Sequence, residues 1–108
     1  MRVECRVGGS DLNPYLAIAS QLAAGLKGIE EKLALEAPFS GDAYKADGNR
    51  GIPGTLRAAT DALRRSSMLR EAMGDEVVDH YVRAAEWEQE DFDQKVTDYE
   101  RTRGFERA

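Results

Sequence analysis

The feature that most constrains this chain is a long apolar stretch that follows Pro14. Between residues 15 and 28 the polar side chains are limited to Ser20, Gln21 and Lys27. A helix that is apolar nearly all round is normally buried on every side. Asn13 suits the N-cap, and proline is favoured at the first helical position. We therefore predict a buried helix from Pro14 to about Leu35.

The predicted helix is also rich in small side chains, which let neighbouring backbones approach closely at some cost in helix propensity. These are Ala17, Ala19, Ser20, Ala23, Ala24, Gly25 and Gly28. A chain of 108 residues can hardly surround such a helix alone, so we expect part of a larger protein or a homo-oligomer. A transmembrane span is the weaker alternative, because the run is short for about 20 residues. It is also closed by the charged residues Lys27, Glu30, Glu31 and Lys32.

Residues 2 to 7 alternate between charged and apolar side chains. The charged residues are Arg2, Glu4 and Arg6, and the apolar ones are Val3, Cys5 and Val7. Successive side chains of a β-strand point to opposite faces, so we predict one N-terminal strand, with Cys5 as a small packed side chain rather than a nucleophile. No second convincing strand follows. The partners of this strand must therefore come from outside the chain or from another copy.

Further helices follow a loop at residues 36–54 that is rich in glycine and proline. Apolar spacing and capping residues predict helices over residues 55–65 and 67–73, the second closed by Gly74. A last helix is predicted from residue 75 to about 103, with a break as an alternative. The predicted fold class is mainly α, with one N-terminal strand, a buried helix and two or three further helices.

Several side chains in these helices admit a functional and a structural interpretation. Four arginines suggest an anion site, but interspersed acidic residues favour a solvated face: Arg57, Arg64, Arg65 and Arg70. The carboxylates from Glu86 to Asp93 suggest metal binding, but a helix spreads them around its cylinder. His80 lacks a second ligand nearby and is interpreted as structural. Trp87 lies off the apolar stripe of the last predicted helix and indicates a second contact surface. The stripe consists of Val78, Tyr81, Val82, Ala85, Phe92, Val96 and Tyr99.

Composition narrows the classes of partner. The net charge is −5, so no basic stripe is available for phosphates and nucleic-acid binding is disfavoured. The N-terminus is charged and lacks an early apolar segment, which argues against a signal peptide. Cys5 is the single cysteine, so an internal disulfide is impossible, and we expect a cytoplasmic protein with no membrane partner.

Three segments near the N-terminus resemble the C-terminal part of the glutamine synthetase family. They are Arg2-x-Glu4-x-Arg6, Asp11-x-Asn13-Pro14-Tyr15-Leu16-Ala17 and Ala23-Ala24-Gly25-Leu26-x-Gly28-Ile29-Glu30. Weaker segments follow in the family's order: Gly41-Asp42-Ala43-Tyr44, Ile52-Pro53-Gly54-Thr55-Leu56, Val96-Thr97-Asp98-Tyr99-Glu100 and Arg103-Gly104-Phe105-Glu106-Arg107. The resemblance covers essentially the whole chain. It implies that residues 1–108 are a C-terminal fragment of the family's catalytic α+β domain.

The resemblance implies an ATP-dependent reaction in which the γ-carboxylate of glutamate is phosphorylated and then attacked by ammonia or an amine. It assigns Glu4 as a ligand of Mg²⁺ or Mn²⁺. It assigns Arg6 as the catalytic residue that stabilises the transferred phosphoryl group, and Arg2 as a contact to the phosphates of ATP. These residue types suit the roles, because hard cations prefer carboxylate oxygen and guanidinium matches phosphate geometry.

In the family, the other metal ligands, the nucleotide pocket and the amine site lie upstream of this segment. We therefore expect the isolated chain to be inactive and to bind neither ATP nor metal. The expected partners are the missing N-terminal part of the catalytic domain, further copies in a homo-oligomer, and glutamate with ammonia or an amine. The loop and tail resemble the γ-glutamylpolyamine and γ-glutamylputrescine synthetases in particular.

Two alternatives stay open. Tyr44 lies near the position of the family's adenylylated tyrosine, but the surrounding residues match that motif poorly and a packing role is favoured. The rival functional class is a non-enzymatic helical module, derived from a truncated family member, that self-associates and does no chemistry.

Overall fold

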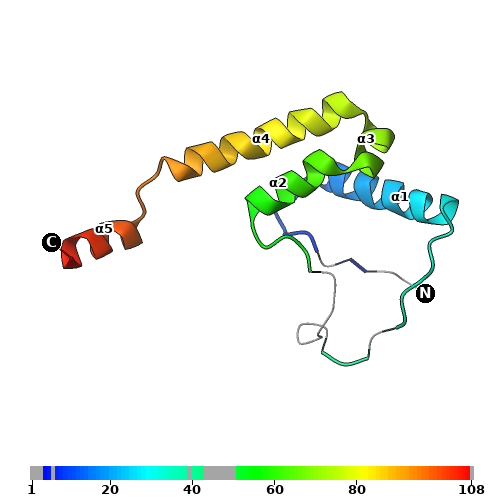
Figure 1. Cartoon of the computed structure of the whole chain (residues 1–108), viewed down its shortest axis with the longest axis horizontal. Coiled ribbons are helices and arrows are strands. Elements are labelled where there is room, and N and C mark those ends of the chain that lie inside the picture. Colours follow the sequence, from blue (N-terminus) through cyan, green and yellow to red (C-terminus); the bar gives the residue numbers. More distant parts are fainter. Residues whose placement is uncertain (1–3, 6, 39, 43–50, 108) are drawn as a thin grey trace.

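The computed structural model describes residues 4–5, 7–38, 40–42 and 51–107, and five helices lie within them (Figure 1). The helices are α1 (Pro14–Glu30), α2 (Leu56–Arg65), α3 (Ser67–Met73), α4 (Asp75–Asp93) and α5 (Asp98–Glu106). The mainly helical character agrees with the sequence pattern. So do the bounds of α2 and α3: α2 begins directly after its expected cap, Thr55, and α3 spans the expected residues 67–73.

Local side chains explain where these helices begin. The Asn13 side chain accepts hydrogen bonds from the first turn of α1, Thr55 caps α2 and Ser66 caps α3. Such caps satisfy backbone N–H groups that have no partner within the helix. Gly74 joins α3 to α4 with a positive φ of 88°, a conformation that glycine adopts without strain.

Three pairs of the described helices make the main contacts. α2 packs along α4 and reaches its last residue through the Arg57–Asp93 ion pair, whereas α3 contacts both α4 and α1, and α5 follows beyond the end of α4 (Figure 1). The buried apolar side chains among the described residues are Val78 and Val82 of α4, which are 2% and 6% exposed. Thr60 of α2 is the buried polar residue, and its hydroxyl donates to the Leu56 carbonyl at 2.8 Å. The core is therefore small and lies between α2 and α4.

The predicted N-terminal strand is wrong. Glu4, Cys5 and Val7 have no strand conformation, and the described part of the chain contains no strand. Arg2, Val3 and Arg6 lie outside the described residues. A strand needs a neighbour to pair its backbone N–H and C=O groups, and the described helices offer none. Cys5 is exposed rather than packed, because the apolar face that would have covered it does not form.

The prediction that α1 is a buried helix is also wrong for this chain. No residue of α1 is buried, and Tyr15 and Ile29 are 85% and 75% exposed. The physical reason is that α1 packs on the short helix α3 along one side only. The helix also ends at Glu30 rather than near Leu35, and Lys32 follows with a positive φ of 50° that ends the helical path.

The last predicted helix is divided in two. α4 ends at Asp93, and α5 begins at Asp98 with a capping box in which Thr97 and Glu100 satisfy each other's backbone N–H groups. Of the apolar residues that recur at helical spacing along this segment, Val78 and Val82 are buried, whereas Phe92, Val96 and Tyr99 are exposed. Within the described residues, no helix combines the length and apolarity that crossing a membrane requires.

Candidate functional site

The residues that the sequence singled out lie just before α1. Glu4 is exposed on this segment, and Arg2 and Arg6 lie outside the described residues. Glu4 offers carboxylate oxygen, the ligand type that Mg²⁺ and Mn²⁺ prefer. The described residues hold no group of three or more His, Cys, Asp or Glu side chains arranged to bind a metal ion. Among those residues, Glu4 therefore fits as a single contributor to a metal site and not as a complete one.

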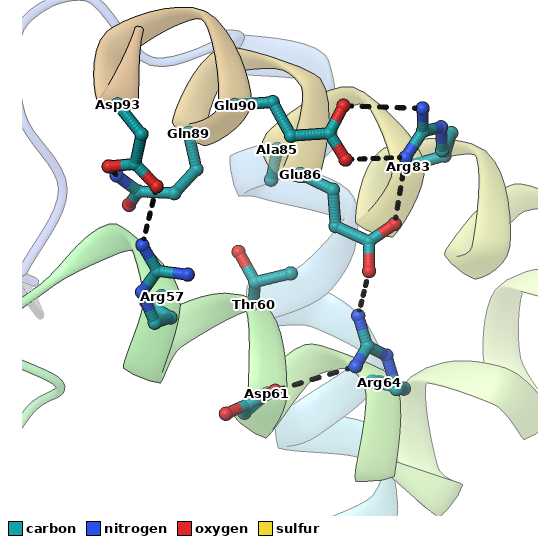
Figure 2. A pocket seen from close by; sticks show the side chains of 10 residues that line it. All are labelled: Arg57, Thr60, Asp61, Arg64, Arg83, Ala85, Glu86, Gln89, Glu90 and Asp93. Atoms are coloured by element: carbon teal, nitrogen blue, oxygen red, sulfur yellow. Dashed lines mark hydrogen bonds and ion pairs between the residues drawn. The ribbon is translucent and has the colours of Figure 1, made fainter.

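A separate charged cleft of about 370 Å³ lies between α2 and α4 (Figure 2). Thr60 lies in the middle of the view, with ion pairs on either side of it. Thr60 and Ala85 are small, and a small residue at a helix crossing lets the two helices approach closely. The cleft thus lies between two packed helices, with small side chains inside it and charged side chains along its edges.

One end of the cleft is closed by Arg57 of α2 and Asp93 of α4, whose Nη2 and Oδ2 atoms are 2.9 Å apart. Gln89 also donates to Asp93 at 2.9 Å. The Arg57 guanidinium, followed by the Gln89 amide, lowers the pKa of the Asp93 carboxyl because both hydrogen bonds favour its charged form. Asp93 therefore remains ionised and holds the end of α4 against α2.

The other end of the cleft is a network of charges. Arg64 pairs with Glu86 of α4 and, at 3.5 Å, with Asp61 on its own helix. Arg83 lies 3.5 Å from Glu86 and 3.1 Å from Glu90, and Glu90 is the main cause of its raised pKa. Each of these arginines has a carboxylate partner, which offsets the positive charge that would attract an anion. Arg57 and Arg64 thus hold α2 against α4, whereas Arg83 pairs within α4. The solvated-face interpretation fits Arg57 and Arg64 better than an anion site.

Arg70 forms a second cluster that spacing alone did not reveal. Its Nε donates to the Arg64 carbonyl at 3.0 Å, and its two Nη atoms donate to Asp75 and Asp79 at 2.7 Å each. Asp79 and then Asp75 raise the pKa of the guanidinium. The turn at Gly74 brings these groups together. In the sequence, the glycine that ends one helix just before Asp75 could have predicted that the chain turns here and brings Asp75 and Asp79 near Arg70.

The remaining candidates are His80, Trp87 and Tyr44. The His80 ring lies edge-on to Tyr81, with ring centroids 5.2 Å apart and an interplanar angle of 86°. This contact agrees with a structural histidine. Trp87 is 58% exposed, so the predicted second contact surface is open in this chain. Tyr44 lies outside the described residues.

Comparison with known proteins gives the family. The model of the glutamine synthetase catalytic domain matches residues 1–104. A gamma-glutamylethanolamide synthetase of Streptomyces coelicolor is 49% identical over 99% of this chain and 23% of its own length. Type-1 glutamine synthetase 2 of Dictyostelium discoideum is 40% identical over 97% of this chain and 21% of its own length.

A glutamate–isopropylamine ligase of a Pseudomonas species is 39% identical over 94% of this chain and 23% of its own length. The chain thus spans less than a quarter of the length of these relatives. The matched region includes the Arg2-x-Glu4-x-Arg6 segment and all of α1 to α4. Because the catalytic-domain model covers nearly every residue, the chain belongs to the glutamine synthetase family.

Proposed function

We propose that residues 1–108 are the C-terminal segment of an ATP-dependent glutamate–amine ligase and supply one wall of its metal and phosphate site. The observation that carries this proposal is the match of residues 1–104 to the glutamine synthetase catalytic domain, which includes the charged segment at residues 2–6. Within this proposal, the complete enzyme uses ATP and Mg²⁺ or Mn²⁺, and its activity needs polypeptide that this chain does not contain.

Three residues carry the proposed chemistry. Glu4 would supply one oxygen ligand to a divalent cation, which when bound neutralises phosphate charge during phosphoryl transfer. Arg6 would stabilise charge that develops on the transferred phosphoryl group, because guanidinium donors match phosphate oxygens. Arg2 would hold the phosphates of ATP. All three come from residues 2–6, and seven residues separate this segment from the start of α1.

The acceptor is proposed to be an amine rather than ammonia. Two relatives are named for amine products or substrates, the gamma-glutamylethanolamide synthetase and the glutamate–isopropylamine ligase. The first is 49% identical, compared with 40% for the type-1 glutamine synthetase of Dictyostelium. Small primary amines are therefore the substrates to test first, followed by polyamines such as putrescine and then ammonia.

A segment exchange tests the proposal. Residues 1–108 would replace the matching segment of the Streptomyces coelicolor synthetase, and γ-glutamyl amide formation would be measured with ethanolamine, putrescine and ammonia. The exchanged enzyme should be active. Glu4→Gln should abolish most activity and weaken activation by Mn²⁺, whereas Arg6→Lys should lower kcat more than it raises the KM for ATP. Glu88→Gln, an exposed carboxylate of α4, is the matched control and should leave the kinetics unchanged.

The rival function is a helical module that self-associates without chemistry. The exposed apolar side chains of α1 favour it, since large apolar patches attract partners. An exchanged enzyme that folds but stays inactive would support this rival, provided that the isolated chain also forms defined oligomers. Unchanged kinetics in both the Glu4 and Arg6 variants would instead contradict the assigned roles alone.

A further inference from the structure

Helix α1 has one side that its own chain covers. The half-buried residues of α1 are Leu16, Ala17, Ser20, Ala23, Lys27 and Gly28. Four of them, Leu16, Ser20, Ala23 and Lys27, lie on one face and are called the inner stripe. The inner stripe lies on the side of α3, where the Lys27 Nζ and Glu71 Oε2 atoms are 3.0 Å apart. Glu71 raises the pKa of Lys27 through this hydrogen bond. The chain thus covers α1 along a side made mostly of small or polar residues.

The more apolar side of α1 is largely exposed, although its Leu22 and Leu26 also line a groove with Met68, Glu71 and Ala72 of α3. It consists of Tyr15, Ile18, Leu22, Leu26 and Ile29, which we call the outer stripe, and these side chains are 59% to 85% exposed. Their spacing of three and four residues places them on one face of the helix. At a rise of 1.5 Å per residue, the outer stripe is about 21 Å long. A stripe of this kind normally faces a core, so the observed packing covers the wrong side of α1 for a complete domain.

We propose that the outer stripe is the surface on which the remaining part of the catalytic domain docks. This inference rests on the proposed function. The relatives contain about three quarters of their length outside the matched segment. An apolar, uncharged face of that polypeptide is the partner whose chemistry fits, because the outer stripe carries no charged side chain.

Gly25 lies next to this surface, three residues after Leu22 and four before Ile29. Apart from its own helical backbone, no heavy atom lies within 4 Å of where a Gly25 side chain would begin. Nothing in the described chain therefore accounts for a glycine here, although glycine costs about 1 kcal/mol relative to alanine inside a helix. A partner backbone that approaches closely would account for it.

A second copy of this chain is the competing occupant. When the docking surface and α1 belong to one polypeptide, their effective concentration reaches roughly the millimolar range. Two separate chains at micromolar concentration lack that advantage. The remaining part of the same catalytic domain should therefore bind the outer stripe in preference to a second copy of the chain.

The test is association in trans. The tagged chain would be co-expressed with the part of the Streptomyces coelicolor synthetase that it does not match, and co-purification would be measured. The two pieces should co-elute. Leu22→Lys should weaken their association at least about tenfold, as for an apolar residue at the centre of an interface. Tyr99→Lys on α5, an equally exposed site away from α1, is the matched control and should have no effect.

A second measurement covers the case in which the separate relative piece is insoluble. In the exchanged single-chain enzyme, Leu22→Lys should lower the thermal midpoint and Tyr99→Lys should not. Gly25→Leu should raise the helicity of the isolated chain, since leucine is a better helix former, yet lower the thermal midpoint of the exchanged enzyme.

Three results would overturn the inference. One is equal behaviour of the Leu22 and Tyr99 variants in both measurements. Another is stabilisation of the exchanged enzyme by Gly25→Leu. The third is self-association of the chain that Leu22→Lys abolishes, together with no binding of the relative piece. An exchanged enzyme that is stabilised through the outer stripe but inactive would refute the proposed function and leave this inference standing.

Discussion

At the scale of single residues, Arg70 shows how one side chain joins three helices. It belongs to α3, donates to the last turn of α2 through the Arg64 carbonyl, and binds Asp75 and Asp79 at the start of α4. Its side chain is 25% exposed, whereas that of Arg83 is 63% exposed. The planar guanidinium suits this arrangement because its donors point in several fixed directions, which a lysine ammonium cannot reproduce.

Arg70→Lys should therefore lower the stability of the helical unit. The lysine keeps the charge but cannot reach the carbonyl and both carboxylates together, so the thermal midpoint should fall by a few degrees. Arg83→Lys is the matched control, because the carboxylates that pair with Arg83 among the described residues, Glu86 and Glu90, lie on its own helix. Its effect should be close to zero in the same circular-dichroism melt. Equal effects of the two variants would mean that Arg70 does not join the helices.

The sequence indicated the types of these residues but not their partners. The interspersed acids suggested a solvated face for the arginines, and Arg57 and Arg64 do have carboxylate partners. Nothing in the spacing, however, paired Arg57 with Asp93 across 36 positions. Such pairs depend on the crossing of α2 and α4, which is a property of packing. The same limit applies to Cys5, whose predicted burial depended on a strand that does not form.

At the scale of elements, helix beginnings were predictable because their causes are local. Asn13 and Thr55 each act on N–H groups within three residues, and Gly74 acts through its own backbone angle. The start of α5 carried an equally local signal that was overlooked, the Thr97-x-x-Glu100 capping box. The strand failed for the opposite reason, because strand pairing depends on residues far away in the chain or outside it.

The start of α5 should be sensitive to acid. Hydrogen bonds from the Thr97 backbone and then its side chain lower the pKa of Glu100 from 4.5 by favouring the carboxylate. A lowered pKa stabilises α5 fully above that ordinary value, and the stabilisation is lost as the pH falls through the lower folded-state value. The carbon-13 shift of the Glu100 carboxyl should report this titration, with the Thr97 amide shifting in parallel.

Glu100→Gln is the control for this titration. The glutamine carbonyl can still accept from the Thr97 N–H but carries no titrating charge, so the Thr97 amide should lose the acid dependence that comes from Glu100. A wild-type Glu100 that titrates at or above 4.5 would contradict the capping-box argument.

The contact between α2 and α4 should depend on one buried side chain. Val78→Ala removes two methyl groups from a site that is 2% exposed, and should cost roughly 2 kcal/mol of unfolding free energy. Val77→Ala is the matched control on the same helix, where the side chain is 38% exposed and the loss should be small. Urea unfolding followed by circular dichroism would separate the two. A similar loss for both variants would show that the core lies elsewhere.

At the scale of the whole molecule, the chain is extended. Its radius of gyration is 18.4 Å, and its dimensions are 60 × 40 × 22 Å. A compact domain of this length would have a radius of gyration of about 13 Å. The apolar pattern of α1 predicted a helix surrounded by protein, and the described residues of this chain do not surround it. The apolar pattern of α1 therefore fits burial inside a larger domain, and the family match identifies that domain as the glutamine synthetase catalytic domain.

The isolated chain should not act as a ligase. Phosphoryl transfer depends on groups held in fixed positions around the transferred phosphate and its cations. Here Glu4 lies on an exposed segment without strand support, and the described residues hold no cluster of three potential metal ligands. A single carboxylate binds Mg²⁺ weakly in water, because the ion gives up its hydration reluctantly.

The assay would supply glutamate, ATP, Mg²⁺ or Mn²⁺ and ethanolamine or ammonia, with the complete Streptomyces coelicolor relative as the positive control. The purified chain should form no γ-glutamyl amide, and calorimetry should detect no metal bound at micromolar concentration. Co-expression with the unmatched part of the relative should restore amide formation, because it adds the missing ligands and fixes α1 in place. Amide formation by the chain alone that Glu4→Gln abolishes would show that 108 residues are sufficient for the reaction.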